Sequence, residues 1–222
     1  MRARPYCPAR RGRWDRALSY LGYVAEKARY GGSPRVIVDG LDALGITVRP
    51  FYLVREPAPE VDPTGAWPPG FEVRYLTEAD MSALVHTPGR PYGVDDLVGR
   101  LRAGQRCLGV SRGGKVVAFG WCNLVECHFD GYRFRLGPDE AYLFDAYVDV
   151  GERGQGLAVQ LRRHLCWDLR AEGRTRLYSV TDAFNVSARR FKERLGARPL
   201  LLAVWVDVFG VVRFTKVVKR YG

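Results

Sequence analysis

Hydrophobic residues recur at every third or fourth position near the start of the chain, with charged residues between them. This spacing predicts an amphipathic helix over residues 13–30. Its apolar face consists of Trp14, Ala17, Leu18, Leu21, Val24, Ala25 and Ala28. Two short runs that follow, Arg35–Asp39 and Thr47–Val54, each predict a strand. The pattern therefore predicts a small folded extension at the start of the chain.

Beyond residue 70 the pattern changes to alternating strands and helices. Strands are expected at residues 72–76, 106–111, 115–124, 132–136, 141–150, 175–181, 199–208 and 211–219. Helices are expected to begin at Thr77 and to cover residues 94–103, 156–172 and 185–195. This order predicts an α/β fold in which helices flank a central, mostly antiparallel mixed sheet.

Five prolines lie between residues 57 and 69, where each removes a backbone donor and disfavours a helix. We therefore expect a linker over residues 57–70. It would separate an N-terminal extension of residues 1–56 from a main domain of residues 71–222. A chain of 222 residues has room for one main domain with such an appendage.

Basic residues outnumber acidic ones, with 35 Lys and Arg against 24 Asp and Glu, so the formal net charge is +11. Such a surface attracts polyanions, including nucleic acid, anionic lipid headgroups and polyphosphate ligands. The sequence has no helix-turn-helix, zinc-finger or stacked-aromatic pattern, so no specific nucleic-acid partner is expected. No apolar run approaches the roughly 18–20 residues that span a bilayer, which favours a cytoplasmic protein.

The five cysteines occur at irregular spacing, which indicates reduced thiols rather than a disulfide framework. A zinc site needs paired Cys or His ligands, and Cys122, Cys127 and His128 form only one incomplete cluster. We therefore expect no metal site, and we expect the cysteines to be small buried residues.

The most informative segment is Val148–Ala158, which runs from the end of a predicted strand into the start of a predicted helix. Its glycines let backbone amides approach an anion, and the helix N-terminus adds unpaired N–H groups and partial positive charge. The segment predicts a pyrophosphate cradle, with an ordinary glycine-rich turn as the alternative. It lacks the Lys-Ser/Thr of a nucleoside-triphosphate loop and the third glycine of a dinucleotide-binding fold.

Within this segment stands Arg153-Gly-Gln-Gly-Leu-Ala158, and after the next predicted strand come Asn185, Ala188 and Leu195-Gly-Ala197. The first run is similar to the pyrophosphate signature Gln/Arg-x-x-Gly-x-Gly/Ala, and the second to the pattern Asn-x-x-Ala…Leu-Gly-aromatic. Together they resemble the GNAT superfamily of acyl-CoA-dependent N-acyltransferases. The resemblance covers about residues 71–219 and implies the GNAT fold for that part of the chain.

The resemblance also implies how acetyl-CoA, or another acyl-CoA, is held. Backbone groups at Val148 and Val150 would pair with the pantetheine arm as an added strand would. Backbone amides would hold the pyrophosphate, at Arg153, Gly154, Gln155, Gly156, Leu157 and Ala158. Asn185 would face the cofactor arm, and capping of the following helix is a second role open to its short side chain.

Attack of an amine on a thioester needs an acceptor for the proton of the amine and a donor for the leaving thiolate. If the strand before the cradle alternates regularly, the face that it shares with Val148 carries Glu140 and Tyr142. A bulge in that strand would reverse the phase and make Asp145 the candidate base. The alternative for Asp145 is a salt bridge to a neighbouring arginine.

In the family the proton donor is often a tyrosine four residues after the motif alanine. Lys192 stands at that position here, so the role of the tyrosine cannot be transferred. Arg189, Arg190 and Lys192 could meet the phosphates of CoA, although surface charge on a helix is the simpler interpretation.

These features predict an N-acyltransferase, most simply an N-acetyltransferase, that transfers an acyl group from acyl-CoA to a primary amine in a ternary complex. The acceptor would be a small molecule or a peptide. The alternative, motivated by the missing tyrosine, is a catalytically silent module that binds CoA or a polyanion. The N-terminal extension could pack on the body of the protein, contact an anionic membrane peripherally, or form an oligomer contact such as that of a homodimer.

Overall fold

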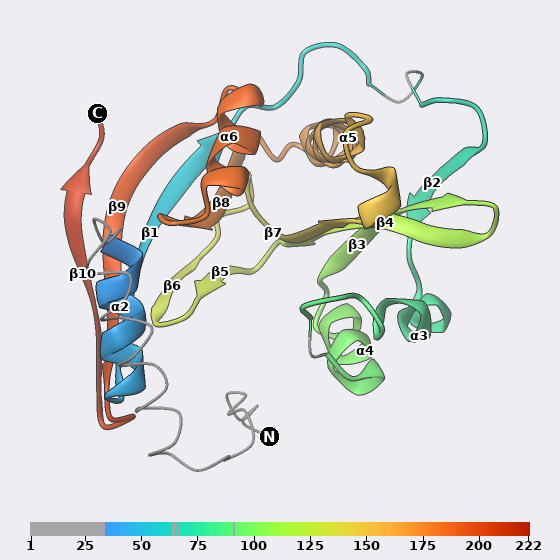
Figure 1. Ribbon diagram of the computed structural model, residues 1–222. Helices are drawn as coiled ribbons and strands as arrows, with labels where there is room; N and C mark the ends of the chain where they lie inside the picture. Colours follow the sequence, from blue (N-terminus) through green and yellow to red (C-terminus); the bar gives the residue numbers. More distant parts are fainter. Residues whose placement is uncertain (1–33, 64, 66, 91) are drawn as a thin grey trace.

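An eight-stranded sheet with helices on both faces forms the body of the protein (Figure 1). The computed structural model describes residues 34–63, 65, 67–90 and 92–222. The sheet contains β1 (Ile46–Glu56), β2 (Phe71–Tyr75), β3 (Arg106–Arg112), β4 (Lys115–Asn123), β7 (Glu140–Val148), β8 (Arg176–Asp182), β9 (Arg198–Val208) and β10 (Val212–Arg220). A separate hairpin consists of β5 (Glu126–Phe129) and β6 (Tyr132–Arg135). The helices are α2 (Pro34–Ala43), α3 (Met81–Leu84), α4 (Val94–Arg102), α5 (Leu157–Ala171) and α6 (Val186–Arg194).

The strands follow the order β10-β9-β1-β8-β7-β4-β3-β2 across the sheet. The pair β7 and β8 is parallel, and the other neighbouring pairs are antiparallel. The expected fold, a mostly antiparallel mixed sheet flanked by helices, is therefore confirmed. The helix expected over residues 13–30 lies outside the described residues.

Strand β1 changes the domain organisation that the sequence predicts. It pairs with β8 on one side and with β9 on the other, so it lies inside the main sheet and not in a separate extension. Phe51, for example, lies opposite Asp182 of β8 and Ala203 of β9. The predicted boundary after residue 56 therefore falls between two parts of one structural unit.

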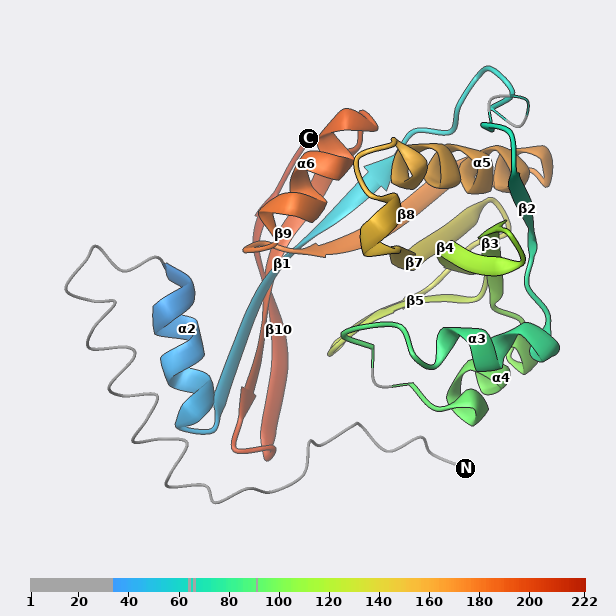
Figure 2. The ribbon, with the colours of Figure 1, turned by 45° about the vertical axis from the view of Figure 1, so that its right-hand side comes forward.

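The strand expected at Arg35–Asp39 is also wrong, because these residues belong to α2. Their β-branched run favours a strand locally, but Pro34 suits the first position of a helix, where its missing N–H costs nothing. Gly45, with φ +85°, follows the end of the helix, as is typical of a helix terminus. Helix α2 lies along β1, on the half of the sheet away from α5 (Figure 2).

Helix α5 covers one face of the sheet with a row of leucines spaced four residues apart (Figure 1). This row is Leu157, Leu161, Leu165 and Leu169, and all four are buried. Leu161, Leu165 and Leu169 share one core cluster with residues of the sheet, which are Leu108, Val110, Ala118, Ala141, Leu143 and Leu177. Burial of each leucine stabilises the fold by roughly 1.5–3 kcal/mol, which fixes α5 and the loop before it to the sheet.

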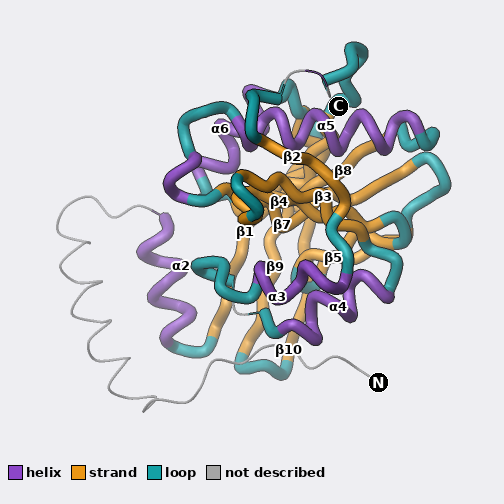
Figure 3. The backbone as a smooth tube through the Cα atoms, turned by 90° about the vertical axis from the view of Figure 1, so that its right-hand side faces the viewer, coloured by secondary structure: helices purple, strands orange, loops and turns teal. Residues whose placement is uncertain are grey.

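The opposite face is covered by α3 and α4 over one half of the sheet and by the β5–β6 hairpin nearer its middle (Figure 3). Met81, Leu84 and Leu97 from the helices pack on Phe119 and Trp121 of β4. A 3₁₀ turn, Glu78–Asp80, leads into α3, and the backbone N–H of Thr77 donates to Asp80 at 2.7 Å, as in a capping box.

Strands β7 and β8 pair over only half of their length. Their parallel register runs from Glu140 opposite Arg176 to Leu143 opposite Ser179, and the two strands are not paired beyond that point. In the unpaired part, Asp145 has φ +47°, and the register of β7 against β4 shifts by one residue there. This is a β-bulge. It shifts the alternation of side chains by one residue, so the residues before it point to the opposite face from the one that regular alternation back from Val148 would give.

The proline-rich segment between β1 and β2 lies over α5 (Figure 1). Trp67 Nε1 donates to His164 Nδ1 of α5 at 3.0 Å, and Arg170 Nη1 of α5 donates to the carbonyl of Pro59 at 3.0 Å. The segment is therefore attached to the helix at two points.

Candidate active site

The loop between β7 and α5 presents a row of free backbone amides. Gly154 and Gly156 have φ of +83° and +78°, a conformation that glycine adopts without strain. Among the described residues, the N–H groups of residues 154–158 have no intramolecular hydrogen-bond acceptor. Because they stand at the N-terminus of a fifteen-residue helix, the partial positive charge there favours an anion.

The space next to this amide row is open. A Cβ atom built on Gly154 or Gly156 would meet no heavy atom within 4 Å. Five consecutive donors, open space and a helix N-terminus together fit a pyrophosphate group. The predicted cradle residues from Arg153 to Ala158 are thus brought together in one loop and the first turn of α5.

The side chains of this loop leave the amides uncovered because they bind elsewhere. Gln155 Nε2 donates to Glu152 at 3.0 Å, and Arg112 also holds that carboxylate, at 3.1 Å. Arg153 Nε donates to the carbonyl of Val148 at 3.2 Å. Val150 lies in a 3₁₀ turn, Val150–Glu152, so the strand edge that a ligand could extend ends at Val148.

Asn185 caps α6. Its Oδ1 accepts a hydrogen bond from the backbone N–H of Ala188 at 3.0 Å. Capping is the second of the two roles that the sequence leaves open for Asn185. With Oδ1 used in this way, the NH₂ group of the side chain is the part that could face a ligand.

Asp145, the candidate base on the bulge, is held by two arginines. Arg90 Nε lies 2.6 Å from one carboxylate oxygen and Arg100 Nη1 lies 2.9 Å from the other. Its side chain is only 8% exposed. The guanidinium of Arg100 also lies over the rings of Tyr92 and Trp121, at 4.1 and 5.3 Å from their centroids. The salt bridge named as the alternative for Asp145 is therefore present.

The other two candidates lie farther from the amide row. Tyr142 is buried and stacks on Phe144 with ring centroids 5.4 Å apart, and burial raises the pKa of its hydroxyl, which therefore stays neutral. Glu140 lies at the start of β7, where it accepts hydrogen bonds from the hydroxyl of Tyr178 at 2.9 Å and from the N–H of Gly137 at 2.8 Å. The three candidates are thus spread along β7 and do not converge on one point.

Lys192 is not a surface residue, contrary to the expectation for its helix. It is 7% exposed, and its Nζ donates to Glu56 at 2.9 Å and to the hydroxyl of Ser179. Ser179 in turn donates to Glu56, and Arg162 Nε lies 3.5 Å from the other oxygen of Glu56. We call Glu56, Arg162, Ser179 and Lys192 the buried cluster. It joins β1, α5, β8 and α6.

The buried cluster shifts the pKa values of its members in opposite directions. Burial alone would raise the pKa of Glu56, but the charges of Arg162 and Lys192, with the hydrogen bonds from Ser179 and Lys192, lower it to about 2. Burial lowers the pKa of Lys192. The negative charge of Glu56 acts to raise this pKa, but the positive charge of Arg162 opposes it. With two cations for one anion, the carboxylate stays ionised, and the Lys192 ammonium is more acidic than that of an exposed lysine.

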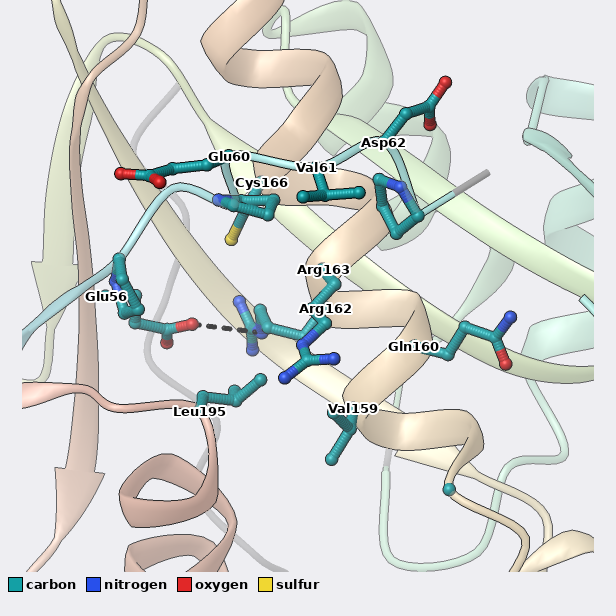
Figure 4. A pocket seen from close by; sticks show the side chains of 14 residues that line it. Glu56, Glu60, Val61, Asp62, Val159, Gln160, Arg162, Arg163, Cys166 and Leu195 are labelled. Carbon is teal, nitrogen blue, oxygen red and sulfur yellow. Dashed lines mark ion pairs between the residues drawn. The ribbon is translucent and has the colours of Figure 1, made fainter. Parts of the chain in front are cut away.

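A pocket of about 840 Å³ joins the buried cluster to the amide row (Figure 4). Along α5 it is lined from Gly156 through Val159 and Arg162 to Cys166. Glu56 and Leu195 line it beside α5, and residues of the proline-rich segment lie across it in Figure 4. A ligand with its anionic group on the amides could therefore reach the cluster.

The buried cluster is the part of the site that the sequence does not reveal. Glu56 stands next to the first proline of the expected linker, which suggests an exposed residue. One signal was present in α5, where Arg162 interrupts the apolar face between Leu161 and Leu165. A charge at a core position has to find a partner, and that partner comes from β1, more than a hundred positions earlier.

None of the helices in the described part of the chain is long and apolar enough to cross a membrane. Within the same ranges, no group of three or more His, Cys, Asp or Glu side chains could hold a metal ion. The four described cysteines are buried and form no disulfide with one another.

Solved structures similar to this chain include a protein from Novosphingobium aromaticivorans assigned to the GNAT family as an acetyltransferase. It is 27% identical with a TM-score of 0.53, over 72% of this chain and 65% of that one. A GCN5-related N-acetyltransferase from Sphaerobacter thermophilus is 18% identical with a TM-score of 0.52, over 86% of this chain and 58% of its own, and shares the fold alone. This chain thus spans under two thirds of either relative. No curated protein matches its sequence.

The model of the acetyltransferase (GNAT) family matches residues 72–197. This range includes β7, the amide row, α5, β8 and α6, and it contains half of the residues that line the pocket described above. Strand β1, which contributes Glu56, precedes it. Because the match covers more than half of the chain and the sheet and amide row agree with it, this chain belongs to the GNAT acetyltransferase family.

Proposed function

We propose that the protein is an N-acetyltransferase that uses acetyl-CoA, or another acyl-CoA, and acylates a primary amine of a small molecule or a peptide. Membership of the family supports acetyl transfer in general. For this chain, the observation that carries the proposal is the row of free amides at residues 154–158, next to open space and a pocket.

The amide row would position the donor by its pyrophosphate. The bound acyl-CoA supplies an activated thioester, and the chain supplies orientation, which removes much of the entropic cost of bringing two reactants together. The edge of β7 over residues 144–148, which is not paired with β8, offers backbone groups to an extended arm. An N–H on this edge would also polarise the thioester carbonyl toward attack.

Asp145→Asn separates a catalytic from a structural role of this carboxylate. Asparagine tolerates positive φ, so the bulge is kept while the charge that pairs with Arg90 and Arg100 is lost. Since both oxygens are already bound, we expect a loss of about 2 kcal/mol in the free energy of unfolding. We expect the kcat/KM of Asp145→Asn to stay within about threefold of the wild-type value at temperatures where the variant is folded.

Asp139→Asn is the matched control, because Asp139 pairs with Arg176 on the surface and should change stability little. If Asp145→Asn instead lowered kcat by about 100-fold and removed the acidic limb of its pH profile, Asp145 would be the general base.

Release of free thiol from acetyl-CoA, followed in the presence of a library of primary amines and amino-terminal peptides, tests the proposal. At least one acceptor should raise the rate well above that of hydrolysis. If the protein bound CoA but no acceptor raised the rate, the proposal would fail in favour of a catalytically silent CoA-binding module.

A further inference from the structure

Exposed apolar side chains gather at the turn between β9 and β10. Phe209 in this turn is 61% exposed, and Val211, which follows it closely, is 83% exposed. Leu44, directly after α2, is 58% exposed, and its neighbour Gly45 accepts a hydrogen bond from the N–H of Phe209 at 2.8 Å. We call Leu44, Phe209 and Val211 the apolar tip. It lies at one end of the molecule, where the end of α2 meets the β9–β10 turn (Figure 1, Figure 2).

The backbone of Phe209 is strained in a way that the turn does not require. Phe209 and Gly210 are the central residues of the turn, with φ of +54° and +72°. Such a turn favours Asn-Gly or Gly-Gly, and a bulky side chain at positive φ costs free energy. The turn between β3 and β4 also has positive φ at both central residues, and it uses Gly113 and Gly114 there. A strained aromatic residue that stays exposed at a turn points to a use for its side chain.

Strand β10 continues the apolar surface along the edge of the sheet. The strand pairs with β9 alone, and its exposed face carries Val212, Phe214 and Lys216 at alternate positions. Val212 and Phe214 are each about half exposed. Val218 is also exposed, at the β-bulge that interrupts the pairing with β9. The apolar surface therefore extends from the tip along β10.

Cations accompany these apolar residues. From residue 209 to the end of the chain there are four basic residues and no acidic one. Arg213 is paired with Asp207 of β9 at 2.8 Å. In the described part of the chain, the basic residues of β10 without a salt bridge are Lys216, Lys219 and Arg220. Even with Asp207 and Asp42, near the tip, counted against the four cations, the surface keeps an excess of positive charge.

We propose that the apolar tip and β10 form a docking surface for an anionic lipid membrane. The tip would enter the layer between the headgroups and the acyl chains, and the cations of β10 would lie against the anionic headgroups. Affinity for a membrane grows with both the buried apolar area and the electrostatic attraction, and this surface offers both. The inference does not depend on the proposed acyl transfer.

A membrane fits this surface better than a protein does. A protein partner needs a groove that receives the protruding side chains of the tip, whereas a fluid lipid layer accepts them without a matching shape. A second copy of the chain that paired its β10 with this one would bring like charges together, which is destabilising.

Co-sedimentation of the full chain with lipid vesicles tests the inference. Vesicles of phosphatidylcholine alone are compared with vesicles that also contain phosphatidylserine, at low and at high salt. The wild type should bind the anionic vesicles, and salt should weaken this binding without abolishing it, because apolar contacts are not screened. The first sixteen residues contain six arginines, which would also attract anionic lipid, so variants of the proposed surface are decisive.

Phe209→Asn combined with Val211→Ser removes most of the apolar tip and leaves the charge unchanged. Asparagine suits the positive φ of the turn, so we expect the fold to be kept. The affinity for anionic vesicles should fall about tenfold at both salt concentrations. Val125→Ser is the matched control, because Val125 is 56% exposed between β4 and β5, and it should leave the affinity unchanged.

Lys216→Gln combined with Lys219→Gln tests the electrostatic part of the surface. At low salt the affinity for anionic vesicles should fall about tenfold, since each cation near the headgroups contributes to the attraction. At high salt, where ions screen the attraction, this variant should approach the wild type, unlike the variant of the tip.

Three results would overturn the inference. The first is a wild type that binds neither kind of vesicle. The second is equal binding by the wild type and the tip variant, because the arginines near the start of the chain would then explain the attachment. The third is a wild-type dimer that the tip variant dissociates in analytical ultracentrifugation with no change in vesicle binding, which would make the surface a contact between copies.

Discussion

Gly156→Glu should weaken the binding of acetyl-CoA by at least about 100-fold, measured by calorimetry. The new side chain would leave the backbone beside the free amides of residues 154–158, where a Cβ meets only open space. Its carboxylate would then compete with the pyrophosphate for the same donors and repel it. A 100-fold loss corresponds to about 2.8 kcal/mol of binding free energy.

Gly173→Glu is a matched control for the backbone strain. Gly173 follows the other end of α5, has φ +83° against +78° at Gly156, and also faces open space. Both substitutions place glutamate in a left-handed conformation, at a cost of about 1–2 kcal/mol in stability. Equal losses of affinity in the two variants, or none in either, would contradict the assignment of the amide row.

Glu56→Ala should lower the free energy of unfolding by about 3–5 kcal/mol. The change leaves Arg162 and Lys192 buried together with no anion between them, and an uncompensated buried charge is strongly destabilising. Urea unfolding at pH 7 measures the effect, with Glu60→Ala on the exposed part of the proline-rich segment as the control. A loss below about 1 kcal/mol would mean that water solvates the two cations in the variant and would contradict this prediction.

The same carboxylate predicts a loss of stability in acid. The pKa of Glu56 is about 2 in the folded protein and near 4.3 in an unfolded chain. Because the folded pKa is the lower one, this stabilisation is complete above pH 4.3 and is lost as the pH falls toward 2. Glu56→Gln should remove this part of the pH dependence, which denaturant midpoints measured from pH 2 to 7 will show.

Much of the fold could be predicted from local patterns. The two-residue turns with positive φ, at Gly113–Gly114 and Phe209–Gly210, join strands close to where the sequence places them. The leucine spacing of α5 gives its bounds to within a residue. By contrast, no local signal says that β1 inserts between β8 and β9, because strand order depends on contacts between distant segments.

The candidate site divides in the same way. The amide row is local, since one loop and one helix N-terminus build it, and its motif predicts it well. The bulge at Asp145 was named as an alternative, but whether it occurs depends on the pairing with β4. The buried cluster depends on four separate elements, so the burial of Lys192 follows only from the assembled sheet.

A crystal structure of the protein with CoA tests the central claim most directly. We expect the pyrophosphate oxygens to accept hydrogen bonds from the amides of residues 154–158, with the arm between β7 and β8. CoA bound elsewhere, with these amides free, would contradict the account.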